Sequence, residues 1–522
     1  MSKVEICTTT SILKRDVSAL EFPLLMEWKV LLLGVYVVLL TFFGAVSLRY
    51  LFHVVAFYFL RKRWSLDPPP LKRYPKVCVQ LPVYNEPFVV ERVIRSAARI
   101  KWPRDKLEIQ VLDDSTDETP EVAARVVEDL KAKGINVKHI RRGNRKGFKA
   151  GALSYGMGIS DAEYFAIFDA DFVPPEDFLL RTVPFLEADP KLAGVQTRWG
   201  FLNEDSSLLT EAQAFMLNLH FVVEQFVRSR LGLWMTFNGT AGVLKRSAVE
   251  WVGGWQTETL TEDSDLSIRL YDRGYRILYL PDVVVPSELP DSVLAFKAQQ
   301  KRWAKGGAQV LRKHWRRILS PKWPLSWKVE VLMQTFGNVG YPLGVLLMFL
   351  LPPVLYVKFS GEFPRLFLAM GVWAVLTIAV VWLAFGVAHY FARGTWKALL
   401  TVPFGMAVVG GLALNNTNAV LEGLFGDRGI FERTPKAGER GIITTAGISK
   451  NLLISRLEVL FATYLVGLVL LSSVTFQMIL ALALATTTFG LMWLGTSSVL
   501  RIEEELPDSV WDWDVEEVGE TL

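Results

Sequence analysis

The chain has 522 residues, 51% of them hydrophobic, and its mean hydropathy of +0.28 is typical of a protein with several membrane segments. The formal net charge is +4, but residues 501–522 hold nine acids and one Arg, so the rest of the chain is distinctly basic. No nucleic-acid-binding motif accompanies this basic excess, which argues against nucleic acid as a partner and is typical of loops facing anionic lipid. The two cysteines lie far apart and predict neither a disulfide framework nor a metal site.

The first predicted membrane segment follows a short N-terminal segment, residues 1–29. Residues 30–60 are almost entirely apolar and end at the basic run 61–63. The stretch is too long for a cleavable signal peptide, and about 20 apolar residues already suffice to cross a bilayer. We therefore expect a transmembrane helix that continues into the cytosol, and the basic run predicts that the next domain is cytoplasmic.

Residues 70–290 are predicted to form a cytosolic α/β domain. The helix expected at 118–133 ends at Gly134, and the helix expected at 263–273 ends at Gly274, because glycine accepts the left-handed conformation that closes many helices. Strands alternating with helices predict a mostly parallel, doubly wound sheet. Three strand-like runs support it: residues 77–81, 107–112 and 164–168.

After the α/β domain the chain is predicted to return to the membrane. Residues 291–330 are basic and Trp-rich, as expected of interface helices, and 333–499 contain further apolar stretches. If all of these stretches crossed the membrane, the loop 426–450 would lie on the non-cytoplasmic side. Its Arg and Lys content instead indicates the cytoplasmic side. We therefore expect 398–424, which contains paired glycines and a run of asparagines, to be an interfacial or re-entrant helix. About four C-terminal spans then remain, before an acidic tail at 500–522.

Two polar groups follow predicted strands, where open α/β sheets bind their ligands. Asp113 and Asp114 follow the second strand, and Tyr84, Asn85 and Glu86 follow the first. Both groups are suited to hold the base and ribose of a nucleotide by hydrogen bonds. Taken alone, the Asp-Asp pair is explained equally well by a helix-capping turn.

Asp169 and Asp171 follow the third predicted strand and place two carboxylates on one turn. Such a pair is suited to hold a hard divalent cation, Mg²⁺ or Mn²⁺, on a diphosphate, although a lone D-x-D motif is a weak signal. Upstream, Lys149 and Gly151 belong to a basic, glycine-bearing loop that is suited to bind phosphate. A solvated charge run is the alternative explanation of that loop.

The cluster Thr261, Glu262 and Asp263 opens a predicted helix, whose dipole stabilises a carboxylate there. We predict Asp263 as a general base that accepts a proton from an acceptor hydroxyl, with Asp265 as its competitor. A helix-capping role is the alternative.

Gln299, Arg302 and Trp303 are spaced to share one helical face. Arg302 is suited to contact a diphosphate and Trp303 to stack on a sugar ring. Ordinary membrane-interface anchoring is the alternative explanation of this face.

The chain carries four signatures in a fixed order: the Asp113-Asp114 pair, D-x-D at 169–171, T-E-D at 261–263 and Q-x-x-R-W at 299–303. This order resembles the membrane-integrated family 2 glycosyltransferases, the group that includes cellulose, hyaluronan and mannan synthases. The resemblance extends from about residue 77 to residue 307. The segments 110–117, 147–153 and 237–242 are most similar to the plant cellulose synthase-like A and C branches. Those branches make β-1,4-mannan or glucomannan and the β-1,4-glucan backbone of xyloglucan.

The resemblance implies a GT-A catalytic domain inserted between transmembrane helices, which inverts the anomeric carbon in one displacement. It assigns the base to Asp263, the cation to Asp169 and Asp171, and nucleotide contact to Asp114. Lys149 and Arg302 would bind the diphosphate. The implied acceptor site comprises Phe237, Asn238, Gly239, Thr240, Gln299 and Trp303.

A later segment, 431–436, resembles the F-x-V-T-x-K gating loop that closes over the nucleotide in cellulose synthase. The resemblance brings Thr434 and Lys436 to the donor, while Arg433 stands where the family pattern has Val.

The expected function is therefore that of a multi-pass membrane enzyme, in the plasma membrane if the source is prokaryotic. It would transfer a hexose to the non-reducing end of a growing β-linked polysaccharide and export the product. UDP-glucose is the favoured donor, and GDP-mannose is the second candidate. The alternative is a non-processive enzyme that adds one sugar to a lipid acceptor. A catalytically inactive scaffold would be expected to lack one of the acids, and all are present.

Overall fold

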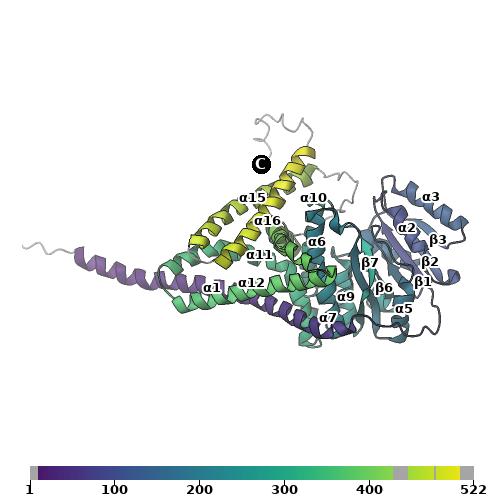
Figure 1. Cartoon of the computed structure of the whole chain (residues 1–522), viewed down its shortest axis with the longest axis horizontal. Helices are drawn as coiled ribbons and strands as arrows, with labels where there is room; N and C mark the ends of the chain where they lie inside the picture. The colour runs from purple at the N-terminus through teal and green to yellow at the C-terminus, as the bar shows by residue number, and fades with distance from the viewer. Residues whose placement is uncertain (1–9, 427–444, 475–477, 506–522) are drawn as a thin grey trace, which may run out of the picture.

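The computed structural model describes residues 10–426, 445–474 and 478–505. It places an α/β domain at one end and a group of long helices at the other, with α10 (Val293–Ile318) between them (Figure 1).

The α/β domain is built on a seven-stranded sheet with the order β3-β2-β1-β4-β6-β5-β7. Neighbouring strands are parallel except where β6 pairs with β4 and with β5. The mostly parallel sheet predicted from the sequence is therefore confirmed. The strands are β1 (Val77–Val83), β2 (Leu107–Asp113), β3 (Val137–Arg141), β4 (Tyr164–Ile167), β5 (Leu192–Phe201), β6 (Gly242–Lys245) and β7 (Arg276–Ser287).

Helices cover both faces of the sheet, because the side chains of a strand alternate between its two faces. Val77 and Val79 of β1 pack in one hydrophobic cluster with α2 (Val90–Ala98) and α3 (Thr119–Ala132). Cys78, between them, packs in the other cluster. The remaining helices of the domain are α4 (Phe148–Gly158), α5 (Phe178–Ala188), α6 (Leu208–Asn218), α7 (Gln225–Arg230), α8 (Arg246–Trp251) and α9 (Glu262–Asp272).

The two helix ends predicted from glycine are present. Gly134 follows α3 with φ +74° and Gly274 follows α9 with φ +81°, values that favour glycine. Between α6 and α7 the segment Leu219–Glu224 is a π-helix whose side chains are mostly buried. A π-turn inside a helix is rare and frequently marks a functional site.

Long apolar helices make up the other end of the structure. By length and composition, five helices in the described residues could cross a membrane: Glu27–Arg63, Gly340–Phe359, Pro364–Arg393, Asn451–Leu470 and Ala481–Ile502. They belong to α1 (Thr10–Leu60) with the short turn after it, α11 (Leu325–Phe359), α12 (Pro364–Arg393), α15 (Thr445–Val474) and α16 (Met478–Glu505).

A sixth apolar segment is bent. The helix formed by η5 (Trp396–Thr401) and α13 (Val402–Gly411) meets α14 (Ala413–Phe425) at 41°, so the pair is either one broken span or a re-entrant loop. The bend lies where the sequence has its paired glycines. A side chain at Gly411 would collide with the backbone of Gly490 in α16, at 2.6 Å, so glycine permits this close helix contact.

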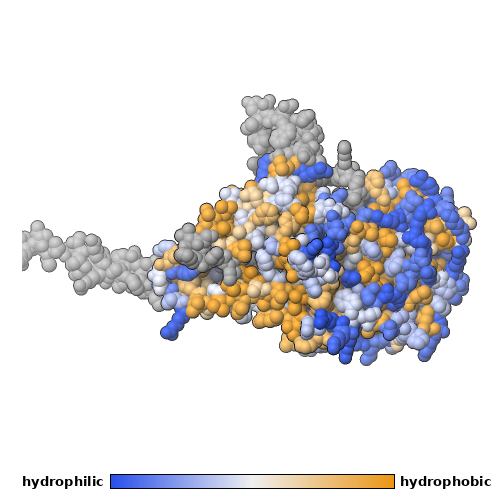
Figure 2. All heavy atoms as spheres, viewed as in Figure 1, coloured by the Kyte–Doolittle hydropathy of each residue, from blue (hydrophilic) through white to orange (hydrophobic). Residues whose placement is uncertain are grey.

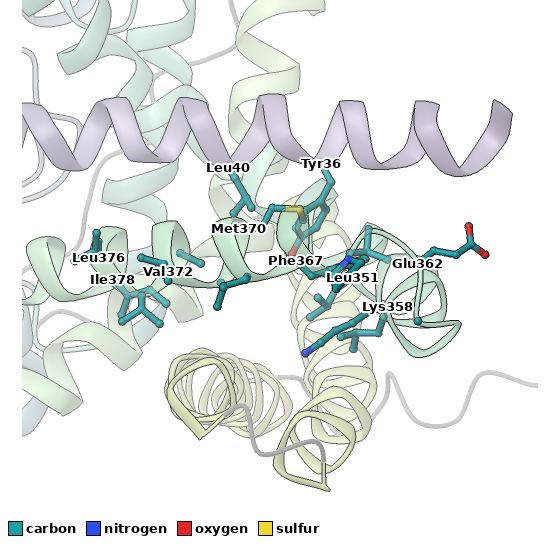
Figure 3. A pocket seen from close by; sticks show the side chains of 18 residues that line it. Tyr36, Leu40, Leu351, Lys358, Glu362, Phe367, Met370, Val372, Leu376 and Ile378 are labelled. Carbon is teal, nitrogen blue, oxygen red and sulfur yellow. The ribbon is translucent and has the colours of Figure 1, made fainter. Parts of the chain in front are cut away.

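The surface of the long helices is apolar. Figure 2 shows hydrophobic side chains gathered over the half of the molecule that contains α1 and α12, and hydrophilic ones over the sheet. Leu31, Val38 and Phe59 of α1 are 70%, 68% and 73% exposed, which suits lipid contact. An apolar groove of about 880 Å³ lies between α1, α11 and α12, far from the sheet, with the Lys358 side chain along one wall (Figure 3).

Candidate active site

The carboxyl edge of the sheet holds two adjoining cavities. The first, of about 130 Å³, lies beside the ends of β1 and β2, and the second, of about 150 Å³, lies beside α9 and α10. Because five residues line both of them, the two cavities form one cleft with a shared wall. The shared residues are Lys149, Asp169, Asp171, Gln299 and Arg302.

The shared wall contains the two carboxylates predicted to hold a cation. Asp169 directly follows Phe168 at the end of β4, and its backbone N–H donates to Thr240 Oγ1 at 2.9 Å. Lys149 Nζ lies 2.6 Å from Asp169 Oδ1 and donates to the Gly239 carbonyl at 3.0 Å. These contacts hold Asp169 against the loop between α7 and β6.

The donor set fits a hard cation that keeps part of its ligand shell for phosphate and water. Asp169 and Asp171 offer only oxygen ligands and line both cavities. In the described residues, no three His, Cys, Asp or Glu side chains surround one point. Mg²⁺ in particular is commonly bound through one or two carboxylates together with substrate phosphates.

Glu262 and Asp263 begin α9 and line the second cavity. Removal from water and the charge of Glu262 raise the pKa of Asp263 to about 7. Burial likewise raises the pKa of Glu262, although Lys149 opposes the shift. Asp263 Oδ1 accepts a hydrogen bond from the Ser264 N–H at 2.7 Å. A carboxyl group that titrates near neutral pH is suited to accept a proton from a hydroxyl group.

Asp265, the other candidate base, lies in a different environment. It is fully buried and lines neither cavity. Its carboxylate accepts hydrogen bonds from Arg269 Nε at 2.8 Å and from His314 Nε2 at 2.7 Å. Despite burial, His314 and Arg269 hold the pKa of Asp265 well below its usual value. The geometry thus favours Asp263 as the base and gives Asp265 a structural role between α9 and α10.

Gln299, Arg302 and Trp303 lie on one face of α10, as their spacing predicts, and all three line the second cavity. Burial lowers the pKa of Arg302, while Asp169 and Glu262 oppose the shift. Gly306, one turn further along, sets how closely α10 approaches α9, because a Cβ there would collide with Thr261 Cγ2. Thr261 also lines the second cavity.

We expect Gly306→Ala to lower the specific activity at least about tenfold, because the added methyl group must move either Thr261 or the helix carrying Arg302. The measurement is the initial rate of sugar transfer per folded protein. Gly158→Ala is the matched control, since a Cβ there meets nothing within 4 Å. Equal rates for the two variants would contradict the tight packing of α10 on Thr261.

The first cavity is lined by most of the residues predicted to contact the nucleotide. Tyr84, Glu86 and Asp114 line it. Arg142 Nε donates to Asp114 Oδ1 at 2.9 Å. The Arg145 guanidinium lies 3.3 Å from the centre of the Tyr84 ring. The first cavity thus offers an aromatic ring, carboxylates and guanidinium groups to a base or a phosphate.

Two residues that were predicted to contact the nucleotide, Asp113 and Asn85, line neither cavity. They instead connect the turns that follow β1 and β2. Asp113 is 1% exposed, and its carboxylate binds His139 Nε2 and the Ser115 N–H, each at 2.8 Å. Asn85, with φ 55°, has its Oδ1 2.8 Å from the Thr116 N–H. In this structure His139 and backbone groups of the neighbouring turns engage these two side chains, and their contact with the base or ribose stays a prediction.

Several other residues that were predicted to contact the donor or the acceptor do not line the cleft and instead support its walls. Gly151 lies against the Lys146 carbonyl, where any larger residue would collide, so it permits the tight turn into α4. Phe237 is fully buried in the core. Thr240 and Gly239 bind Asp169 and Lys149 through the hydrogen bonds that hold the shared wall. Of the four residues Phe237–Thr240, only Asn238 lines a cavity. Thr434 and Lys436 lie outside the described residues.

Residues that the sequence motifs did not single out also support or line the second cavity. Trp199 of β5 and Glu288 after β7 line it. Gln196 Oε1 accepts the Asn238 N–H at 2.8 Å, so it holds the loop before β6. His220 Nε2 lies 2.9 Å from Asn238 Nδ2. Only the spacing of His220 and Glu224, four residues apart, offered a signal, and it carries no chemistry by itself.

Comparison with known proteins gives the same family as the motifs. A family model described as "Glycosyl transferase family group 2" matches residues 164–408, which include Asp169, Asp263 and Arg302. The chain carries a family 2 glycosyltransferase domain. The match and the mixed, mostly parallel sheet confirm the predicted GT-A fold.

The family 2 domain has plant relatives. The chain is 48% identical to "Probable glucomannan 4-beta-mannosyltransferase 7" of Oryza sativa subsp. japonica over 244 residues, which cover 46% of this chain and 42% of that protein. It is 45% identical to "Glucomannan 4-beta-mannosyltransferase 7" of Arabidopsis thaliana over 267 residues, which cover 50% and 48%. The chain thus spans about half the length of these curated relatives.

Among solved structures, the chain is similar to the mannosyltransferase PcManGT from Pyrobaculum calidifontis, described in complex with GDP-Man and Mn²⁺. The identity is 25%, the TM-score is 0.48, and the match covers 68% of this chain and 98% of that one.

Proposed function

We propose that the protein is a processive, inverting β-glycosyltransferase that transfers a hexose from a nucleotide-sugar to the non-reducing end of a β-1,4-linked polysaccharide. The observation that carries the proposal is the set of residues that line the second cavity. They include Asp263, whose pKa is raised to about 7, Arg302, and the two carboxylates suited to hold a cation. The names of the plant relatives, which are mannosyltransferases, favour mannose over glucose as the transferred sugar, and we propose GDP-mannose as its donor.

The first cavity is suited to the nucleotide and the second to the acceptor. Tyr84 and Asp114 would contact the nucleoside, while Lys149 and Arg302, on the shared wall, would bind the diphosphate as it becomes the leaving group. Asp263, which also lines the second cavity, would accept the proton of the acceptor hydroxyl as that oxygen attacks the anomeric carbon. A single displacement of this kind inverts the configuration.

Asp169 and Asp171 would hold the divalent cation, which neutralises the developing charge on the diphosphate when bound. The chain's own contribution is to fix the first of these carboxylates: Thr240 binds the Asp169 backbone, and Lys149 binds the Asp169 side chain. Trp303 and Trp199 line the second cavity and offer apolar rings on which a sugar can stack.

We further propose that the catalytic domain is cytoplasmic and that the bent segment 396–425 does not cross the membrane. Exposed Arg61, Lys62 and Arg63 directly follow α1, as expected for a helix whose C-terminal end faces the cytosol. With 396–425 re-entrant, its end at Gly426 and the start of α15 at Thr445 are expected on the same side of the membrane as the cleft.

The deciding experiment incubates membranes containing the protein with a panel of radiolabelled nucleotide-sugars, with and without Mg²⁺ or Mn²⁺. We expect GDP-mannose to give a polymer whose linkage analysis shows 4-linked mannose, and EDTA to abolish its formation. A singly glycosylated lipid as the only product would overturn processivity. An absence of transfer from every donor would overturn the proposed function.

The pKa of Asp263 predicts the pH dependence of this reaction. A base must be ionised to act, and the raised pKa keeps Asp263 protonated below about pH 7. We therefore expect kcat/KM for the acceptor to fall about tenfold per pH unit below about pH 7 and to level off above it, because this parameter reports the free enzyme. A flat profile between about pH 5 and about pH 8 would contradict the assignment of Asp263.

A further inference from the structure

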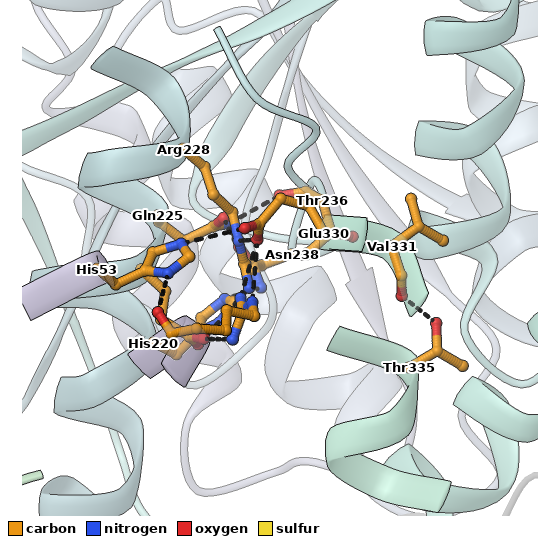
Figure 4. Close-up of polar contacts among 11 residues, drawn as sticks. His53, His220, Gln225, Arg228, Thr236, Asn238, Glu330, Val331 and Thr335 are labelled. Carbon is orange, nitrogen blue, oxygen red and sulfur yellow. Dashed lines mark hydrogen bonds and ion pairs between the residues drawn. The ribbon is translucent and has the colours of Figure 1, made fainter. Parts of the chain in front are cut away.

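A buried cluster of charged groups joins two long apolar helices to the catalytic domain (Figure 4). Arg49 of α1 binds Glu224 of the π-helix at 2.6 Å and Glu330 of α11 at 2.9 Å. Arg228 of α7 is fully buried and binds the same two carboxylates, at 3.3 Å and 2.9 Å. Two cations and two anions therefore balance within the cluster.

A chain of hydrogen bonds leads from this cluster to the second cavity. Arg228 Nη1 lies 3.4 Å from Gln225 Oε1. Gln225 Nε2 donates to the Thr236 carbonyl at 2.9 Å and to Asn238 Oδ1 at 2.8 Å. Asn238 Nδ2 lies 2.9 Å from His220 Nε2. His220 Nδ1 lies 3.6 Å from Glu224 Oε2, which closes the ring.

The directions of the hydrogen bonds that run from Gln225 through Asn238 to His220 are determined. The Thr236 carbonyl can only accept, so it requires the amide nitrogen of Gln225, and that nitrogen in turn requires the amide oxygen of Asn238. The Asn238 nitrogen must then face His220, whose Nε2 has to be the acceptor. His220 consequently carries its proton on Nδ1, toward Glu224. Although burial favours the neutral acid, Arg49 and Arg228 hold the pKa of Glu224 well below its usual range, so it is an acceptor.

Asn238 thus has both ends of its amide fixed while it lines the second cavity. One hydrogen on Nδ2 binds His220, and no residue in the described part of the chain is seen to accept the second, which leaves it for a ligand oxygen. A fixed donor of this kind suits a sugar hydroxyl, because pre-organised hydrogen bonds avoid the entropy cost of ordering on binding.

We propose that His220 is a positioning residue that orients the Asn238 amide toward a hydroxyl group of the acceptor sugar, and that α1 and α11 anchor it through Glu224 and Glu330. This inference rests on the proposed function, since it assigns Asn238 to the acceptor. An acceptor that is held less firmly competes less well with water, so loss of His220 shifts the reaction from transfer toward hydrolysis of the donor.

The test compares three variants with the wild-type protein, using radiolabelled GDP-mannose, Mn²⁺ and β-1,4-mannohexaose as the acceptor. His220→Leu removes the acceptor nitrogen, and His220→Gln can place an amide oxygen there. His389→Leu is the matched control: His389 is buried between α12 and α6 and lies 3.0 Å from Asn218 Nδ2, a pair of the same chemistry outside the cleft. The measured quantity is the ratio of donor hydrolysis to transfer, which global destabilisation does not change.

For His220→Leu we expect the ratio and the KM of the acceptor to rise about tenfold, with the KM of the donor unchanged. His220→Gln should restore the ratio to within about threefold of wild type, and His389→Leu should leave it unchanged. If His220→Leu does not fold, Gln225→Glu serves instead, because its carboxylate oxygen opposes Asn238 Oδ1 and should raise the ratio equally. A wild-type ratio in the folded His220→Leu or Gln225→Glu protein would overturn the role of the ring. A wild-type protein without transfer would overturn the proposed function itself.

Discussion

Asp263→Asn should slow sugar transfer strongly while leaving donor binding intact. The amide keeps the shape of the side chain and can still accept from the Ser264 N–H, but it cannot take a proton from a hydroxyl group. We expect kcat to fall about 10³-fold, within the usual contribution of a general base. The measurement pairs initial rates of polymer formation with the Kd of the nucleotide-sugar in the presence of Mn²⁺.

Asp272→Asn is the matched control for this substitution. Asp272 lies at the other end of α9, where it binds Trp323 Nε1 at 3.1 Å and lines neither cavity. Its variant should retain most of the wild-type rate. If Asp263→Asn kept more than about a tenth of that rate, another group would have to be the base.

Glu330→Gln is expected to have the largest effect on stability. The Glu330 side chain is buried and binds both Arg49 and Arg228. The variant leaves two buried guanidinium groups with Glu224 as their remaining carboxylate in the cluster. Loss of one partner from a buried ion pair costs about 3–5 kcal/mol. Thermal unfolding in detergent, followed by tryptophan fluorescence, should show a clearly lower midpoint temperature.

Two further variants test the cause of that loss. Arg49→Gln combined with Glu330→Gln removes one charge of each sign, so the double variant should lose less stability than the two single effects together. Glu362→Gln removes an exposed carboxylate that pairs with Lys29, and an exposed pair of this kind contributes little. An unfolding midpoint for Glu330→Gln equal to that of Glu362→Gln would contradict the importance of the cluster.

The sequence predicted well those features that depend on local pattern. Apolar runs ending in acids located β2 and β4, and Gly134 and Gly274 marked the ends of α3 and α9, because each signal lies within a few neighbouring residues. The spacing of Gln299, Arg302 and Trp303 placed them on one face of α10, and that face does line the cleft.

The roles of individual residues could not be predicted from the same patterns. Asp113 and Asp114 are neighbours in sequence, yet one is buried against His139 and the other lines the first cavity. The choice depends on which side of the strand end each residue faces, and on partners far along the chain. Likewise His220 acts through Asn238, 18 residues away. No local motif encodes a contact that forms only when the π-helix packs beside the loop before β6.

The wall shared by the two cavities limits how the enzyme can be redesigned. Lys149, Asp169, Asp171, Gln299 and Arg302 line both cavities, so a change made to alter the choice of donor also reshapes the space for the acceptor. Exchanging single residues with a relative of different sugar preference would therefore disturb both substrates together. A chimera that exchanges α4, the turn after β4 and α10 as one block keeps that wall matched, and it is the better route to a polymer of altered composition.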